Sequence, residues 1–299
     1  MAADPALPPG ELRAAAAFVR QRCGVDLDDT KGYLVAGRWQ ELLRESGCAT
    51  VGDLCRRAAG DADLADRLID AICTKETSFF RDSHPFELLT RSLVPDQLAR
   101  LTAAGGSGRR LRLWCAACST GQEVYSLAMA LDRSPQLDSS WATTVLASDL
   151  SATALERARA GRYTQFEADR GLSAELRQRY FTAASDGWTV IPRLRQGLRF
   201  ARLNLLDLPA GLGDFDIIFC RNVATYFGPD DRGRLFEGLA DHLVPGGALV
   251  VGATESLVGV TSRLDLCRQG RSSYYRRVAG AAGEGEDGAG RAGFGRRRR

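Results

Sequence analysis

Four short segments of the 299-residue sequence carry side chains that could bind one ligand together. The first, LWCAACSTGQEVYS, passes from a strand-like run through small residues into a helix. Small residues let backbone N–H groups approach a ligand, and the start of the helix adds unpaired donors. The dinucleotide pattern G-x-G-x-x-G is absent, because Ala116, Ala117 and Cys118 stand where glycines might. With Glu123 beside it, the turn suits a ligand with a cationic amine better than one with phosphates.

Each of the other three segments places polar residues after a strand-like run. Asp149 ends the run ASD and could bind ribose hydroxyls, because a carboxylate can bridge a vicinal diol. Its alternative role is to cap the next helix, which Ser151 could do instead. Asn204 and Leu205 suit an adenine, whose edge forms hydrogen bonds while its face needs apolar cover. The fourth segment is FCRNVATYF. Ribose, adenine, a cationic amine and no phosphate cradle together describe S-adenosylmethionine.

Short apolar strands that alternate with helices position these segments. After the break GGSG at 105–108, the expected strands are 111–117, 143–148, 215–220 and 248–253, and the expected helices are 121–133, 151–160 and 229–243. This alternation predicts a buried parallel sheet with helices on both faces. Ligands of such sheets bind outside the carboxyl ends of the strands, where the four segments converge.

The chain as a whole divides into four parts. We expect a disordered start at 1–10, a small helical domain at 11–100 and a ligand-binding domain at 101–278, with an antiparallel piece at about 180–200. The stretch SSYYRRV (272–278) could be a final edge strand. The Gly- and Arg-rich residues 279–299 contain almost no core-forming side chains and are predicted to be disordered.

Composition excludes several classes of protein. With 44% hydrophobic and 26% charged residues the chain is globular, and no apolar run approaches the ~20 residues of a membrane span. A net charge of +3 offers no case for nucleic acid, and because the first residues contain no basic region followed by an apolar one, we do not expect secretion. Of eight cysteines, Cys115 and Cys118 alone form a C-x-x-C pair, without a second pair or a histidine to complete a metal site. We expect small buried residues there, no metal, and a reducing cytoplasmic location.

Six motifs in order resemble those of the CheR-type chemotaxis-receptor methyltransferases: TKETSFFRD, LWCAACSTGQEVYSLAMAL, ASDLSATALERARAGRY, NLLDLP, DIIFCRNVATYF and LVPGGALVVGATESL. The likeness runs from about Phe18 to Val278 and includes KGYLVAGR in the helical domain. It implies an α/β fold: a Rossmann-like class I methyltransferase sheet with a small antiparallel β-subdomain and an N-terminal all-helical domain. It also implies methyl transfer from S-adenosylmethionine to receptor glutamate side chains, giving glutamate methyl esters and S-adenosylhomocysteine.

The resemblance also assigns residues. Carried over motif by motif, the residues at the cofactor are Lys75, Thr77, Arg81, Ala117, Glu123, Asp149, Asn204, Leu205, Arg221 and Asn222. Arg81 and Tyr226 would flank the transferred methyl as catalytic residues. The chain departs from the family at four places: Lys75 replaces a usual asparagine, Gln122 the first of two glutamates and Ala117 a common glycine, and GATES (252–256) differs from glycine-His-Ser-Glu.

Methyl transfer to a carboxylate agrees with the scarcity of histidine, which occurs only twice. A glutamate, with an ordinary pKa of about 4.3, is ionised at neutral pH and needs no general base. Arg81 would orient this carboxylate by charge-assisted hydrogen bonds, and Tyr226 would close the site from the opposite side. The alternative role for Arg81 is an ordinary ion pair with Asp82 or Glu87.

Partner recognition leaves alternatives open. Lys31, Arg38 and Arg44 could present a basic face to an acidic helix of the receptor's cytoplasmic domain, or they could line an ordinary solvated helix. The β-subdomain could bind the receptor's C-terminal peptide through a strand edge. A non-catalytic CheR-like scaffold module is the second functional hypothesis; Lys75 favours it, whereas Arg81 and Tyr226 oppose it. A small-molecule methyltransferase and a dinucleotide oxidoreductase rank lower.

Overall fold

The computed structural model describes residues 7–105 and 109–278. Most of the start expected to be disordered and the whole tail at 279–299 lie outside this range, although the first helix already begins at Pro9. None of the helices in the described part is long and apolar enough to span a membrane.

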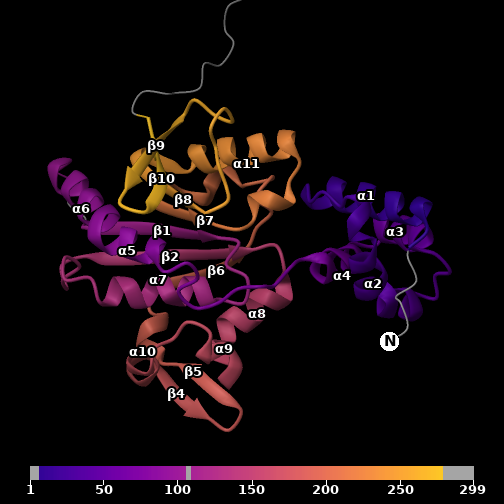
Figure 1. Cartoon of the computed structure of the whole chain (residues 1–299), viewed down its shortest axis with the longest axis horizontal. Coiled ribbons are helices and arrows are strands. Elements are labelled where there is room, and N and C mark those ends of the chain that lie inside the picture. Colours follow the sequence, from indigo (N-terminus) through magenta and orange to yellow (C-terminus); the bar gives the residue numbers. More distant parts are fainter. Residues whose placement is uncertain (1–6, 106–108, 279–299) are drawn as a thin grey trace, which may run out of the picture.

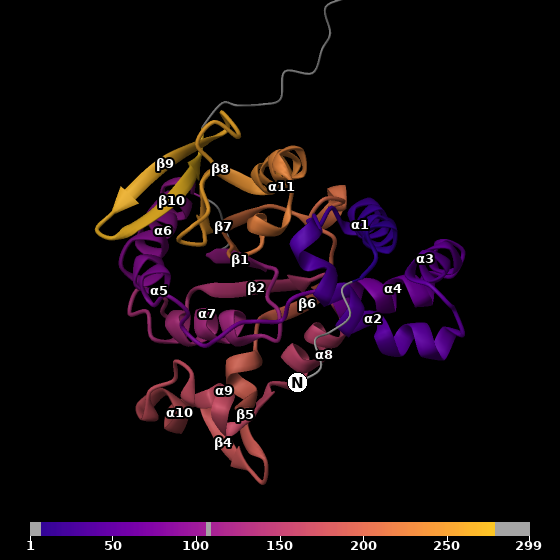
Figure 2. The same cartoon turned by 45° about the vertical axis from the view of Figure 1, so that its right-hand side comes forward.

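The first four α-helices share one apolar core. They are α1 (Pro9–Cys23), α2 (Gly32–Ser46), α3 (Val51–Ala59) and α4 (Ala62–Ile72), with a 3-10 turn, η1 (Asp29–Lys31), before α2. Thr50 caps α3 by accepting a hydrogen bond from the Asp53 N–H. Trp39 is fully buried, and its indole N–H donates to the Leu68 carbonyl at 3.0 Å. These helices lie beside α8 and the end of β6 (Figures 1 and 2).

A seven-stranded sheet forms the centre of the molecule, with strand order β6-β2-β1-β7-β8-β10-β9. Its strands are β1 (Arg110–Ala116), β2 (Ala142–Asp149), β6 (Leu198–Arg202), β7 (Phe215–Cys220), β8 (Leu243–Val251), β9 (Leu264–Gln269) and β10 (Ser272–Arg277). The five strands from β6 to β8 are parallel, and β10 pairs antiparallel with both β8 and β9. The order switches between β1 and β7, which is where an open sheet of this kind binds its ligand.

Helices cover both faces of this sheet (Figure 1). They are α5 (His84–Leu88), α6 (Val94–Ala103), α7 (Gln122–Asp132) and α8 (Ala152–Ala160) on one face and α11 (Pro229–Asp241) on the other, with a π-helical turn, η2 (Leu89–Leu93), joining α5 to α6. Alternate residues of β1 serve the two faces: Leu113 and Cys115 join the core under α7, whereas Trp114 and Ala116 join the core under α11.

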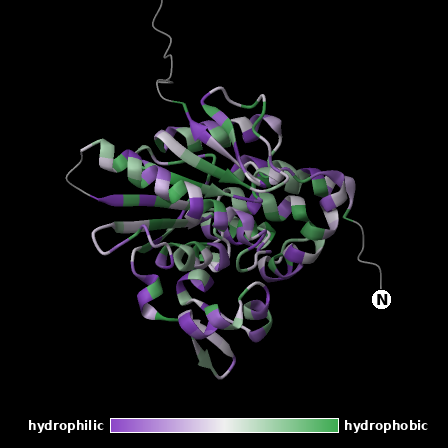
Figure 3. Cartoon of the chain, turned by 60° about the vertical axis from the view of Figure 1, so that its left-hand side comes forward, coloured by the Kyte–Doolittle hydropathy of each residue, from purple (hydrophilic) through white to green (hydrophobic). Residues whose placement is uncertain are grey.

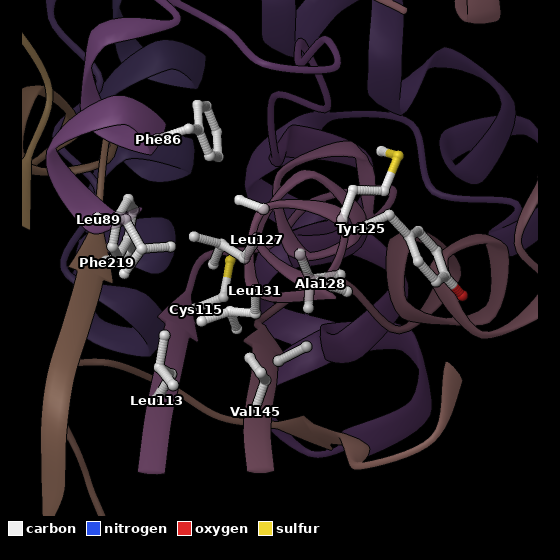
Figure 4. Packing of buried hydrophobic residues seen from close by; sticks show 14 of the residues in the cluster. Phe86, Leu89, Leu113, Cys115, Tyr125, Leu127, Ala128, Leu131, Val145 and Phe219 are labelled. Atoms are coloured by element: carbon white, nitrogen blue, oxygen red, sulfur yellow. The ribbon is translucent and has the colours of Figure 1, made fainter. Parts of the chain in front are cut away.

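The apolar runs found in the sequence are the buried strands. In Figure 3 the strands at the centre are mainly hydrophobic, while the helices show mixed colours. Figure 4 shows Leu113, Cys115 and Val145 of β1 and β2 beneath Leu127 of α7, with Phe219 of β7 beside Leu89. The expected Rossmann-like sheet is therefore confirmed.

A separate three-stranded sheet, ordered β3-β5-β4, forms the small β-subdomain. Its strands are β3 (Arg162–Tyr163), β4 (Phe181–Ala184) and β5 (Gly187–Val190), and α9 (Gln165–Asp169) and α10 (Ala174–Tyr180) lie between β3 and β4. The antiparallel piece is thus present, but it begins about 20 residues before position 180 because the two-residue β3 pairs with β5. The final strand also differs from expectation: β10 lies inside the sheet, and β9 forms its edge.

Helices α5 and α6, which follow Ile72, pack with the sheet and not in the core of α1–α4. Phe86, Leu89 and Leu98 belong to the core under α7, whereas the core of the first four helices ends at Ile72. The sequence prediction of a helical domain reaching residue 100 differs from this packing, because helical periodicity does not reveal which core a helix joins. We therefore propose the domain boundary at residues 73–75.

Candidate functional site

A cavity of about 480 Å³ lies at the carboxyl ends of β1, β2 and β7, within the size range of small-molecule sites. It contains nine of the ten expected cofactor residues together with Tyr226: Thr77, Arg81, Ala117, Glu123, Asp149, Asn204, Leu205, Arg221 and Asn222. The helical domain closes one side through Cys23, Val25 and Ile72. The expected convergence of the four segments is therefore what the structure shows.

A buried ion-pair network forms one wall of the cavity. The guanidinium of Arg221, whose side chain is 1% exposed, donates to the Glu123 carboxylate and to the Asp82 carboxylate, both at 2.6 Å. One nitrogen of this guanidinium, Nε, is buried without a partner among the described residues. Of these three residues, Glu123 and Arg221 line the cavity and Asp82 does not, so the two charges of this wall balance each other.

Asp149 is held at the end of β2 by the backbone of two loops. Its carboxylate accepts hydrogen bonds from the Ser119 N–H at 2.8 Å and the Ser151 N–H at 2.9 Å. Burial raises the pKa of Asp149, and the backbone hydrogen bonds oppose that rise. Ser151 caps α8 by accepting from the Ala154 N–H, so the capping role considered for Asp149 belongs to Ser151. The Asp149 carboxylate remains available to line the cavity.

Asn204 connects the two domains across the cavity. Its amide nitrogen donates to the Arg22 carbonyl at the end of α1 at 3.1 Å, and its amide oxygen accepts from the Leu206 N–H at 3.1 Å. These bonds fix the plane of the amide. Leu205 is buried beside it, which supplies the apolar cover that an adenine face would need.

Strained backbone surrounds the cavity. All six non-glycine residues with positive φ in the described chain lie in three segments that reach it: Phe80, Asp82, Ser83, Ala117, Ser119 and Asn222. Ala117, at φ 61°, occupies a conformation that glycine adopts more easily. Strain of this kind persists only where neighbouring contacts determine the backbone, and it concentrates at functional sites.

Arg81 and Tyr226 enter the cavity from different elements. Arg81 lies in the strained turn at 79–83, and neither Asp82 nor Glu87 pairs with it: Asp82 pairs with Arg221, and Glu87 pairs with Arg91. Within residues 7–105 and 109–278, Arg81 forms no ion pair. Tyr226 ends the short helix η5 (Ala224–Tyr226), and its carbonyl accepts from the Asp26 N–H of the helical domain at 2.8 Å.

Glu255 is a residue that the sequence prediction missed. Its carboxylate accepts four backbone hydrogen bonds: from Gly252 at 2.7 Å, Asn222 at 2.9 Å, Val223 at 2.9 Å and Ala224 at 2.7 Å. It thereby shapes the turn that carries Arg221, Asn222 and Tyr226. Glu255 belongs to the motif GATES (252–256). The sequence prediction noted this motif only as a departure from the family pattern and assigned Glu255 no function.

Lys75 does not line the cavity, contrary to expectation. Its ammonium donates to the Asp70 carboxylate at 2.9 Å and to the Thr153 hydroxyl at 2.7 Å. Asp70 also accepts from the Ser151 hydroxyl at 2.6 Å, so α4 of the helical domain is tied to the start of α8. The lysine therefore joins two domains and does not place its charge beside the cofactor site.

Replacing Asp70 with asparagine should lower the free energy of unfolding by about 2–3 kcal/mol at pH 7, because a carboxylate with several donors is replaced by one amide oxygen. Burial alone would raise the pKa of Asp70, but hydrogen bonds from Ser151, Lys75 and Thr153 lower it to about 2. The stability that Asp70 provides is therefore present above about pH 4 and lost as the pH falls toward 2. Urea titrations between pH 2 and 7 should show a weaker acid dependence in the variant. Asp63→Asn, an exposed change on α4, is the control; an equal loss there would contradict the assignment.

The expected basic face of the helical domain is not formed as a unit. Lys31 pairs with Asp28 of its own turn at 3.2 Å, and Arg38 donates to the last carbonyl of α4 at 2.8 Å. Arg44 is exposed but pairs with Glu41 at 3.5 Å. Lys31 and Arg38 are thus bound to groups of the helical domain itself.

The cavity as a whole suits a cationic ligand without phosphates. Its charged lining residues are Glu76, Arg81, Glu123, Asp149 and Arg221, a net charge of −1. Among the described residues, no group of three or more His, Cys, Asp or Glu side chains could hold a metal ion. The arrangement places hydroxyl-binding, amide and acidic groups around one space, with Arg81 and Tyr226 on its wall.

Comparisons with known proteins agree with this geometry. Residues 10–73 match the family model "CheR methyltransferase, all-alpha domain", and residues 75–272 match "CheR methyltransferase, SAM binding domain". Chemotaxis protein methyltransferase 1 of Pseudomonas aeruginosa is 39% identical over 264 residues, covering 87% of this chain and 94% of that protein. The chemotaxis protein methyltransferase of Vibrio parahaemolyticus is 38% identical over 273 residues, covering 89% and 96%.

A solved structure of the N-methyltransferase NodS from Bradyrhizobium japonicum WM9 is 16% identical, with a TM-score of 0.36, and covers 66% of this chain and 99% of that one. That likeness is too slight to add to the assignment. The two family models and the relatives above 30% identity suffice: the chain belongs to the CheR methyltransferase family.

Proposed function

We propose that the protein transfers a methyl group from S-adenosylmethionine to glutamate side-chain carboxylates of a chemoreceptor's cytoplasmic domain, giving glutamate methyl esters and S-adenosylhomocysteine. One observation carries the proposal. The Arg81 guanidinium lines the same cavity as Glu123, Asp149 and Asn204, yet it has no carboxylate partner in the described chain. A cation in this position suits an incoming carboxylate.

The residues that would hold the cofactor fit its chemistry. Asp149 would accept from the ribose hydroxyls, and Asn204 with Leu205 would take the adenine. Glu123, which lines the cavity beside Arg221, would favour the cationic methionine end. When bound, S-adenosylmethionine supplies an electrophilic methyl group on a sulfonium.

The protein's own side chains would orient the two reactants. Arg81 would hold the substrate carboxylate by charge-assisted hydrogen bonds, and Tyr226 would limit its position from the other wall. No group needs to remove a proton, because a glutamate with a pKa of about 4.3 is ionised at neutral pH. Orientation of this kind can account for roughly 7–11 kcal/mol of a reaction barrier.

The alternative, a non-catalytic module, loses the observation that favoured it. The non-catalytic alternative depends on Lys75, a departure from the family motif whose charge would lie beside a cationic sulfonium. In the structure that charge is bound by Asp70 and Thr153, and Lys75 is not among the cavity residues. Arg81 and Tyr226, the two residues that we propose to position the reactants, do line the cavity.

The β-subdomain is the surface that we propose for a receptor's C-terminal peptide. Strand β4 pairs with β5 on one side only, and its residues Thr182, Ala183 and Ala184 are exposed. A free strand edge can add an extended peptide through main-chain hydrogen bonds. Residues 162–190, which span the three strands of the subdomain, contain four arginines and four acidic residues, so main-chain hydrogen bonds and not net charge would hold such a peptide.

A cytoplasmic location is part of the same proposal. All eight cysteines are free thiols in the structure, which agrees with a reducing compartment.

The test incubates the full chain with S-adenosylmethionine labelled in its methyl group and with receptor cytoplasmic fragments from the same organism. Base-labile label on receptor glutamates, absent when those glutamates are replaced by alanine, is the expected result. Cofactor binding by calorimetry without any transfer of label would contradict the proposal and support the non-catalytic module.

A further inference from the structure

We propose that the β-subdomain is a positioning element of methyl transfer, because it braces the turn at residues 79–83 that carries Arg81. We call residues 79–83 the Arg81 turn. The inference rests on the proposed function, since it assigns the subdomain a task in that same reaction. Three contacts carry it: an aromatic anchor, a glycine contact and an ion pair.

The aromatic anchor is Phe79, the first residue of the Arg81 turn. Its side chain is 1% exposed and belongs to the same core as the subdomain. The ring packs edge-on against Tyr163 of β3, with centroids 4.9 Å apart, and against Phe181 of β4, with centroids 5.6 Å apart. Two strands of the small sheet therefore pack against Phe79, the residue that starts the turn.

The glycine contact brings backbone against backbone. Gly171, between α9 and α10, has φ 103°, and a Cβ at this position would lie 1.9 Å from the Phe79 carbonyl oxygen. Every other residue type would push the Arg81 turn and the subdomain apart, since the neighbouring atom is backbone and cannot rotate away. Glycine is required here by both the φ angle and the space.

The ion pair lies beside the cavity. Arg170, the neighbour of Gly171, pairs with Glu76 at 2.6 Å, and Glu76 lines the cavity. The Glu76 carbonyl in turn accepts a long hydrogen bond from the Arg81 guanidinium at 3.5 Å. The subdomain thus reaches the catalytic arginine through one intervening residue.

The turn needs such support because its backbone is strained. Phe80, Asp82 and Ser83 have φ angles of 46°, 65° and 42°. The turn is held on its other side by the Ser126 hydroxyl, which accepts from the Phe80 N–H at 2.9 Å, and by Arg221, which donates to the Arg81 carbonyl at 3.0 Å. Loosening the subdomain contact should let the turn relax and move the Arg81 side chain, while the ribose and adenine residues stay in place.

The deciding experiment compares Gly171→Ala with Gly270→Ala. Gly270 also has positive φ (58°), but it lies in the turn between β9 and β10 with open space around its Cα. Gly171→Ala should lower kcat about 10- to 100-fold, because small displacements of a positioning group have effects of this size. The Kd for S-adenosylmethionine should change far less than kcat. Gly270→Ala should keep the wild-type kcat and Kd.

A second series keeps the inference testable if Gly171→Ala does not fold. Phe79→Leu retains apolar volume and Phe79→Ala removes it, so kcat should fall in the order Phe, Leu, Ala, again with a small change in the cofactor Kd. Wild-type kcat in Phe79→Ala or Gly171→Ala, or equal losses of kcat and cofactor affinity, would overturn the positioning role. An inactive wild-type enzyme would instead contradict the proposed function.

Discussion

An Arg81→Ala variant is expected to bind S-adenosylmethionine within about threefold of the wild-type Kd while losing roughly 10²- to 10³-fold in kcat. The reason is the position of Arg81. It lines the cavity without an ion pair among the described residues, so its removal leaves no buried carboxylate unpaired. Glu123, Asp149 and Asn204 keep their own hydrogen bonds to other groups. Calorimetry for the cofactor and label transfer to a receptor fragment measure the two effects separately.

Two further variants sharpen this prediction. Arg81→Lys keeps the charge but loses the planar fork, and it should recover only part of the activity. Arg91→Ala removes an exposed arginine whose pair with Glu87 spans 3.9 Å, and it should keep wild-type kcat and stability. Wild-type turnover in Arg81→Ala would show that the substrate carboxylate is oriented by another group.

The sheet was predictable because its central strands are almost wholly apolar. The strands β1, β2, β7 and β8 appear within a few residues of the expected ranges, since burial on both faces leaves a continuous run in the sequence. Strand β9, with the sequence LDLCRQ, was missed because an edge strand exposes one side and mixes polar with apolar residues. Strand β3 has two residues, too few for any period.

The sequence predicts which segments meet at the site, but it does not predict the direction in which each side chain points. Strand ends converge by topology, so nine of the ten residues expected at the cofactor line one cavity. Lys75 lies in the right segment, yet its side chain turns to Asp70 of a helix that the motif does not include. The Arg38 guanidinium likewise donates a hydrogen bond to the carbonyl of Ile72 at the end of α4. Such contacts depend on where distant helices dock, which spacing along the chain does not encode.

Replacing Glu255 with glutamine should lower the free energy of unfolding by about 2–4 kcal/mol and weaken cofactor binding by about tenfold or more. The carboxylate accepts two N–H groups on each oxygen, and a glutamine would turn one –NH₂ group toward two of these donors. The turn with Asn222, at φ 58°, would then lose the contacts that hold its strained backbone. Urea unfolding and calorimetry with S-adenosylmethionine measure the two losses.

The control for this variant is Glu237→Gln. Glu237 is 43% exposed and pairs with Arg263 at 3.2 Å on the surface of α11, so its loss should cost at most about 1 kcal/mol. A shortened Glu255→Asp carboxylate keeps the charge but withdraws it from the Asn222 turn, and it should resemble Glu255→Gln in cofactor affinity. If Glu255→Asp and Glu255→Gln both bound the cofactor as the wild type does, the turn would be held by its own packing. We expect both variants to bind the cofactor more weakly than the wild type. Four backbone N–H groups donate to the Glu255 carboxylate, and no other described carboxylate accepts a hydrogen bond from that turn.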